Sequence, residues 1–133
     1  MAKSGQPSLF SQRLRHAREL AGITQYELGL RVGLDESVAG PRINQYENGV
    51  HQPRQEMALD LAKALGVPAA YLSTQDEVLA RLLLSWPNLT ADQRLKYAER
   101  AEADAARAAR VTAKTAQTDS PSRKGPARPR KKP

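Results

Sequence analysis

A chain of 133 residues has room for one compact domain and little else. It contains no cysteine, which excludes a disulfide framework, a thiolate nucleophile and a cysteine-based metal site. The net charge of +7 is unevenly distributed, because residues 112–133 hold seven Lys/Arg and a single Asp. Residues 1–111 are therefore close to neutral, and the basic character belongs to the end of the chain.

The first part of the chain shows helical periodicity interrupted by glycines. Ser8 can cap a first helix whose apolar residues recur at intervals of three and four, and Gly22 is placed to end it. Thr24 and Glu27 have the spacing of a capping box. This spacing predicts a second helix that runs to about Val32 and stops at the glycine that follows.

More helical segments follow at short intervals. A third helix is predicted over 41–48, with Pro41 at its first position, where the missing N–H costs nothing. Later helices are predicted over 54–65, 68–72, 76–86 and, capped by Thr90, from there to about Val111. No run of alternating apolar and polar residues competes with this pattern. The predicted fold class is all-α.

Gly29 lies inside the predicted second helix, where glycine costs roughly 1 kcal/mol relative to alanine. Close approach of a neighbouring helix would explain it, and Gly33 can supply the turn that follows. Two short helices joined in this way form a helix-turn-helix, in which the second helix enters the major groove of DNA.

Several motifs of residues 9–72 occur in a characteristic order. They are Arg13-Leu14-x3-Arg18, Gly22-Ile23-Thr24-Gln25-x-Glu27-Leu28, Gly33-Leu34, Ile43-x2-Tyr46-Glu47-Asn48-Gly49 and Leu61-Ala62-x-Ala64-Leu65-Gly66-Val67. In this combination the sequence resembles the Cro/phage-repressor type of helix-turn-helix domain, also called the xenobiotic-response-element family. The resemblance implies a five-helix, lambda-repressor-like domain that binds two-fold symmetric operators in double-stranded DNA as a homodimer.

The resemblance also implies roles for individual residues. Gln25 matches a glutamine that contacts a backbone phosphate and supports the reading residues. Arg18 and Glu47 match an ion pair that fixes the orientation of the recognition helix. Asn48 matches a phosphate contact, although an Asn before Gly is also a good helix stop.

The expected reading surface is formed by Arg42, Asn44 and Gln45, the polar residues around the apolar anchors of the third helix. Arg pairs with guanine, and Asn or Gln with adenine, although each can also serve a phosphate or face solvent. Gln45 is the first choice for a base contact, followed by Arg42. On the next loop, His51 and Arg54 are candidates for contacts with the DNA backbone.

The sequence departs from the family between Gly33 and the third helix, where the connecting segment is longer. The pair Gly40-Pro41 favours a lengthened loop there over an added helical turn. Asp35 and Glu36 would be repelled by phosphates and are expected to point away from DNA. Ser37 is a candidate DNA contact.

The predicted organisation is a flexible N-terminus (1–7), a helix-turn-helix domain (8–73), a helical extension (74–111) and a disordered basic tail (112–133). In the extension, Ala98, Ala101, Ala105 and Ala108 alternate at spacings of three and four, which suits a dimer seam or packing onto the same chain. The tail suits either an arm that tracks phosphates or a solubilising end.

No catalytic constellation, cofactor motif or metal-ligand cluster is recognisable, so we expect a transcriptional regulator, in particular a repressor, and not an enzyme. One alternative is an antitoxin-type protein whose C-terminal part binds a partner protein while the helix-turn-helix represses its own operon. Another is non-specific binding to the nucleoid through the tail. With no apolar signal or membrane-spanning run in the sequence, we expect a cytoplasmic, nucleoid-associated protein and no membrane partner.

Overall fold

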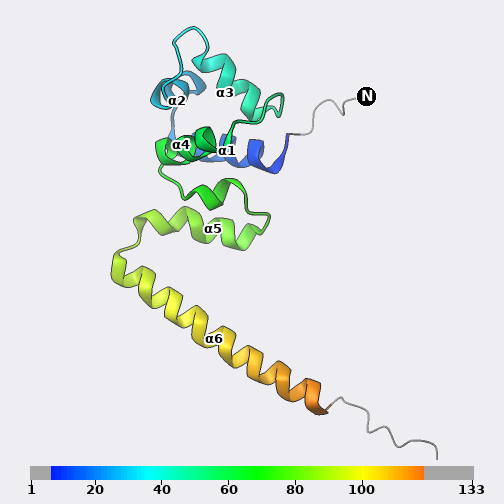
Figure 1. The fold of residues 1–133 in the computed structure, drawn as a ribbon. Helices are drawn as coiled ribbons and strands as arrows, with labels where there is room; N and C mark the ends of the chain where they lie inside the picture. Colours follow the sequence, from blue (N-terminus) through cyan, green and yellow to red (C-terminus); the bar gives the residue numbers. More distant parts are fainter. Residues whose placement is uncertain (1–6, 119–133) are drawn as a thin grey trace, which may run out of the picture. The chain divides into compact units, whose positions relative to one another are not determined.

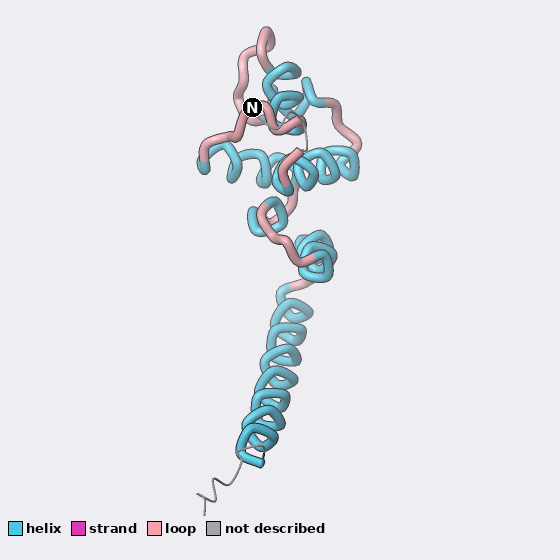
Figure 2. The backbone as a smooth tube through the Cα atoms, turned by 90° about the vertical axis from the view of Figure 1, so that its right-hand side faces the viewer, coloured by secondary structure: helices cyan, strands magenta, loops and turns pink. Residues whose placement is uncertain are grey.

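The chain divides into two units, Met1–Leu89 and Thr90–Pro133, and the computed structural model describes residues 7–118. Every regular element among these residues is helical, as Figures 1 and 2 show, and the predicted all-α class is confirmed. None of the helices in this part of the chain combines the length with the hydrophobicity of a membrane-spanning segment.

The first unit carries seven of the helical elements of the described residues. They are α1 (Leu9–Ala21), α2 (Gln25–Arg31), α3 (Ala39–Glu47), α4 (Gln55–Leu65), the 3₁₀ turn η1 (Ala69–Leu72), α5 (Glu77–Ser85) and the 3₁₀ turn η2 (Trp86–Asn88). The capping box predicted for α2 is confirmed, because the Glu27 N–H donates to Thr24 Oγ1 at 3.0 Å and the Thr24 N–H to Glu27 Oε2 at 3.3 Å. Gly22 ends α1 in the left-handed region, with φ at +69°.

The core of this unit lies where α1, α2, α3 and α4 meet. Each of these helices contributes one large aliphatic side chain with no exposed area, namely Leu14, Leu28, Ile43 and Leu61. Burial of such a side chain contributes about 1.5–3 kcal/mol to folding. The four helices are therefore held around one apolar centre, and the outer surfaces of α2 and α3 are left for other contacts.

Helix α5 is fastened to α1 by a buried guanidinium. Arg13, 8% exposed, donates to both carboxylate oxygens of Glu77 at 3.0 and 3.3 Å and twice to the carbonyl oxygen of Thr74. It also lies 5.4 Å from the centre of the Tyr71 ring. A charge this buried needs partners, and Thr74 and Glu77 lie just beyond residue 73, the predicted end of the helix-turn-helix domain. In the structure α5 lies in the same compact unit as α1 to α4, Met1–Leu89.

The second unit contains α6 (Ala91–Thr118). Thr90 and Gln93 form a second capping box at its start, with bonds of 2.9 and 3.1 Å. The helix continues seven residues past its predicted end at Val111, so the expectation of a disordered tail is wrong for residues 112–118. Those residues include good helix formers and no proline, and each residue added to an existing helix gains a hydrogen bond. The rest of the predicted tail, 119–133, and residues 1–6 lie outside the described residues.

Candidate nucleic-acid interface

Helices α2 and α3 approach each other at Gly29. A Cβ atom placed on Gly29 would lie 2.6 Å from both the Cβ and the carbonyl oxygen of Ala39, a distance that real side chains do not tolerate. The close approach that the sequence predicted at Gly29 is therefore confirmed. It fixes α3 against α2 at the first residue of α3 and sets the angle of the helix-turn-helix.

The segment between α2 and α3 is a turn organised by Asp35. The carboxylate of Asp35 accepts hydrogen bonds from the Ser37 N–H at 2.9 Å and from the Ser37 hydroxyl at 3.0 Å. These donors lower the pKa of Asp35 below its ordinary value. The Asp35 carbonyl oxygen also accepts from the backbone N–H groups of Val38 and Ala39, at 3.0 and 2.9 Å. The turn thus delivers the chain directly into α3.

Helix α3 begins two residues earlier than predicted and ends at Glu47, so the range 41–48 and the lengthened loop at Gly40-Pro41 are wrong. Pro41 is the third residue of the helix and not the first. It is tolerated because the first four N–H groups of a helix have no partner within it. The early start follows from the packing of Ala39 on Gly29, a contact that local sequence preferences do not reveal.

An ion pair holds the far end of α3 against α1. Arg18 Nε and Nη2 each donate to one carboxylate oxygen of Glu47, both at 2.9 Å, and Nη1 donates to the carbonyl oxygen of Ile23 at 3.0 Å. The Glu47 side chain is 2% exposed and that of Arg18 14%. Hydrogen bonding to Glu47 raises the pKa of Arg18. The structure thus brings Arg18 and Glu47 together as a bidentate pair that fixes the rotation of α3.

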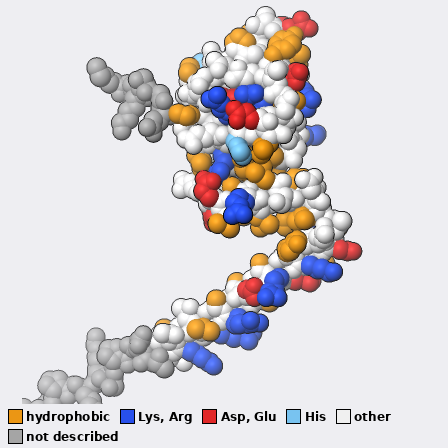
Figure 3. Space-filling view, turned by 180° about the vertical axis from the view of Figure 1, so that it is seen from behind, with side chains coloured by type: hydrophobic (Ala, Val, Ile, Leu, Met, Phe, Trp, Pro, Cys, Tyr) orange, Lys and Arg blue, Asp and Glu red, His pale blue; other side chains and the backbone are white. Residues whose placement is uncertain are grey.

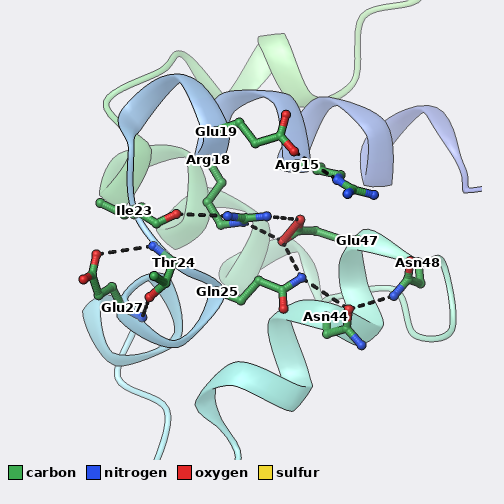
Figure 4. Close-up of polar contacts among 10 residues, drawn as sticks. All are labelled: Arg15, Arg18, Glu19, Ile23, Thr24, Gln25, Glu27, Asn44, Glu47 and Asn48. Carbon is green, nitrogen blue, oxygen red and sulfur yellow. Dashed lines mark hydrogen bonds and ion pairs between the residues drawn. The ribbon is translucent and has the colours of Figure 1, made fainter.

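Gln25 connects this ion pair to the outer surface of α3 (Figure 4). Its Nε2 donates to Asn44 Oδ1 at 3.2 Å and to Glu47 Oε2 at 3.4 Å. Asn48 Nδ2 donates to the same Asn44 oxygen at 2.8 Å. Asn44 is therefore held on both sides through Oδ1, and its Nδ2 points away from both partners in Figure 4. Three of the predicted site residues, Gln25, Asn44 and Asn48, form one connected row.

Arg42, His51 and Arg54 come together in a second group. They line a groove of about 450 Å³ beside α4. The remaining lining residues are Tyr46, Gln52, Glu56, Met57 and Asp60. The basic side chains in this groove are suited to binding a phosphate. The carboxylates of Glu56 and Asp60, which line the same groove, would repel a phosphate placed close to them.

The other two predicted site residues lie elsewhere. The backbone carbonyl of Gln45 accepts from the N–H of Val50 at 2.9 Å and from that of His51 at 3.4 Å, which ties the following loop to α3. The Gln45 side chain is half-buried. Ser37 lies in the turn before α3 with its hydroxyl donated to Asp35, so its proton is already engaged.

Sequence reasoning did not single out Val38 and Pro41, because it placed Val38 in the connecting segment and expected Pro41 only to begin the helix. Val38 is 38% exposed, and Pro41 is exposed on the first turn of α3. With Gln45 they have the spacing i, i+3 and i+7, which places all three along one line of the helix. That spacing would have revealed them had the helix start been known.

Comparison with known proteins agrees with this geometry. A family model described as "Helix-turn-helix" matches residues 14–72, the segment that contains α2, α3 and α4. The chain is also similar to a solved structure of the transcriptional regulator BswR, with 39% sequence identity and a TM-score of 0.65 over 69% of this chain and 91% of that one. No curated protein matches the chain. The chain therefore belongs to the Cro/phage-repressor type of helix-turn-helix proteins and is a DNA-binding transcriptional regulator.

Proposed function

We propose that the protein is a sequence-specific repressor that binds a two-fold symmetric operator as a homodimer and acts by binding, not by catalysis. Helix α3 enters the major groove, and the start of α2 lies against the DNA backbone. One observation carries the proposal. The inner side of α3 is held by buried contacts with α1 and α2, whereas its polar residues Arg42 and Asn44 are exposed and Gln45 is half-buried.

The two polar groups on α3 support different tasks. Arg42 shares its groove with His51 and Arg54, which favours contacts with phosphates as well as a guanine contact at the edge of the site. Gln45 lies on the side of α3 that faces away from α2, which favours a contact with DNA. A glutamine in that position is suited to adenine. Asn44 is held by Gln25 and Asn48, so its free amide nitrogen is a donor in a defined position.

Selection from random duplex DNA by the full chain, followed by sequencing, tests sequence specificity. The comparison proteins are the R42A/Q45A double variant and a chain that ends at residue 118, where α6 ends. Enrichment of a two-fold motif by the full chain and by the shortened chain, with loss of the motif in the double variant, is the expected result. A reporter gene with this motif over its promoter then gives the sign of regulation.

Two results would contradict the proposal. Salt-sensitive binding to any duplex without an enriched motif, lost when residues 119–133 are removed, would make the basic end the functional part. An enriched motif that the double variant retains would move base reading to residues other than those of α3.

Helix α6 is the proposed dimerisation element. Residues 91–104 carry four acidic and three basic side chains, whereas residues 105–118 carry three basic and no acidic ones. Figure 3 shows the same distribution, with red side chains confined to the earlier part of the helix. Antiparallel pairing of two copies would set residues 105–118, with charge +3, against residues 91–104, with charge −1. Parallel pairing would set the two +3 halves against each other, so the charges favour the antiparallel arrangement.

Because α6 continues to Thr118, the proposed alanine seam can extend to Thr112 and Thr115 at the same spacing. The hydroxyl groups of both threonines donate to backbone carbonyl oxygens one turn earlier, each at 3.0 Å. Their polar atoms are thus satisfied within the helix, and their methyl groups are available for packing. The seam would then cover six positions and not four.

The test of the seam is the oligomeric state measured by sedimentation. The A101E/A105E variant places two carboxylates on the seam, whereas A103E/A106E places the same charges on the other face of the same helix. Dissociation of the first variant alone supports the seam. A dimer that survives in both variants leaves α6 free for a different protein, as the antitoxin alternative requires.

A further inference from the structure

We propose that Val38 and Pro41 form an apolar contact that reads the 5-methyl group of thymine at the leading end of α3. The proposal rests on the proposed insertion of α3 into the major groove. It concerns two residues that are not among the candidate DNA contacts predicted from the sequence.

The direction of both side chains follows from their neighbours. Ala39 faces α2, because it fills the space beside Gly29. A Cβ atom on Gly40 would lie 3.8 Å from the Cβ of Tyr26, so that position also faces α2. The next residue along the helix, Pro41, therefore turns away from α2, and Val38 lies one turn before it on the same line.

This line includes the half-buried Gln45 and lies on the side of α3 away from α2. The Arg18–Glu47 ion pair holds the opposite side of the helix in the protein interior, with Glu47 only 2% exposed. In the helix-turn-helix mode of docking, the N-terminal residues of the recognition helix contact base edges. Val38 and Pro41 occupy that end, one at the residue before α3 and the other in its first turn.

Neither side chain can donate or accept a hydrogen bond, so neither can serve a phosphate or a polar base edge. Among the groups on the floor of the major groove, the thymine methyl is the apolar one. The negative charge of Asp35 at the start of the same turn also disfavours an approach of this end to phosphates, and hydrogen bonds from Ser37 keep that carboxylate ionised. An apolar partner on a base is what remains.

The test removes single methyl groups from the operator that the full chain selects. Each thymine is replaced in turn by deoxyuridine, which lacks only the methyl group, and the dissociation constant is measured at fixed salt. We expect one or two thymines of each half-site to weaken binding about fourfold when replaced, from the transfer free energy of a methyl-sized group. In variant operators that carry cytosine at one of those positions, replacing the cytosine by 5-methylcytosine restores the methyl group and tests the same contact.

Val38→Ala and Pro41→Ala identify the protein side of the contact. Both positions are on the surface, and alanine suits a helix start at least as well as proline at its third residue. Each variant should lose sensitivity to uracil at one thymine while keeping it at the others. Leu59→Ala is the matched control, because it removes an exposed aliphatic side chain from α4 and should leave every uracil effect unchanged.

The possible outcomes separate this inference from the proposed function. A selected motif in which no uracil substitution weakens binding overturns the inference and leaves the repressor proposal standing. Uracil effects that persist unchanged in both alanine variants also overturn it, since other residues would then contact the methyl groups. Failure to select any motif contradicts the proposed function itself, and the inference with it.

Discussion

Ala39 occupies the space that a side chain at Gly29 would need. A Cβ on Gly29 would meet both the Cβ and the carbonyl carbon of Ala39, at 2.6 and 2.7 Å. The obstacle includes backbone, which cannot move without displacing α3 as a whole. Gly29→Ala should therefore destabilise the fold by about 1–3 kcal/mol through overpacking, although alanine is the better helix former by about 1 kcal/mol.

Urea denaturation measures this effect, and Gly40→Ala is its control. Gly40 is also helical, but a Cβ there would make only ordinary contact with Tyr26 at 3.8 Å. We expect Gly40→Ala to cost far less than Gly29→Ala. Equal midpoints for the two variants would show that the α2–α3 contact adapts readily, contrary to the packing described above.

Breaking the Arg18–Glu47 ion pair should have a large effect on stability. Glu47→Ala leaves the guanidinium of Arg18, whose side chain is 14% exposed, without its main partner. Loss of one member of a buried pair costs about 3–5 kcal/mol. Glu19→Ala removes a carboxylate from an exposed pair with Arg15, which is worth about 0.3–0.5 kcal/mol. If chemical denaturation gives similar losses for both, the pair does not hold α3 as described.

The turn before α3 should make stability depend on pH in the acidic range. Hydrogen bonds from Ser37 lower the pKa of Asp35 in the folded protein. A lowered pKa means that the contribution to stability is present above the unfolded pKa of about 3.9 and is lost as the pH falls through the folded pKa. The difference in melting temperature between wild type and Asp35→Ala should therefore be constant near neutrality and shrink below about pH 4. Glu36→Ala, at the neighbouring exposed carboxylate, should show no such narrowing; a parallel trend in both would argue against the turn.

Arg54 and Gln45 should affect DNA binding in different ways. Arg54→Ala removes the proposed contact with the DNA backbone and should weaken operator and unrelated DNA alike, while the slope of log K against log salt falls by about 1. Gln45→Ala removes the proposed base contact and should cost about 1–3 kcal/mol on the operator alone. Fluorescence anisotropy at several salt concentrations separates the two effects. Loss of specificity in Arg54→Ala with an unchanged salt slope would reverse these assignments.

Much of the local structure could be read from the sequence. Thr24 and Glu27 mark the start of α2 because a capping box is made by residues three apart in the chain. Gly22 and Gly66 mark the ends of α1 and α4 because only the left-handed region, at φ of +69° in both cases, closes those helices. The cost of a glycine inside a helix even indicated the close approach at Gly29.

Tertiary contacts decided the features that define the interface. Helix α3 begins at Ala39 because that residue packs on Gly29, and the local signal of Gly40-Pro41, which favoured a loop, is outweighed by this contact. Arg13 binds Glu77, 64 positions further along the chain, so α5 is joined to the first unit, which ends at Leu89. Caps and turns involve neighbours a few residues apart, so local sequence determines them. The start of α3, and with it the outward position of Pro41, depends on which surfaces meet in the folded chain, and no local pattern contains that information.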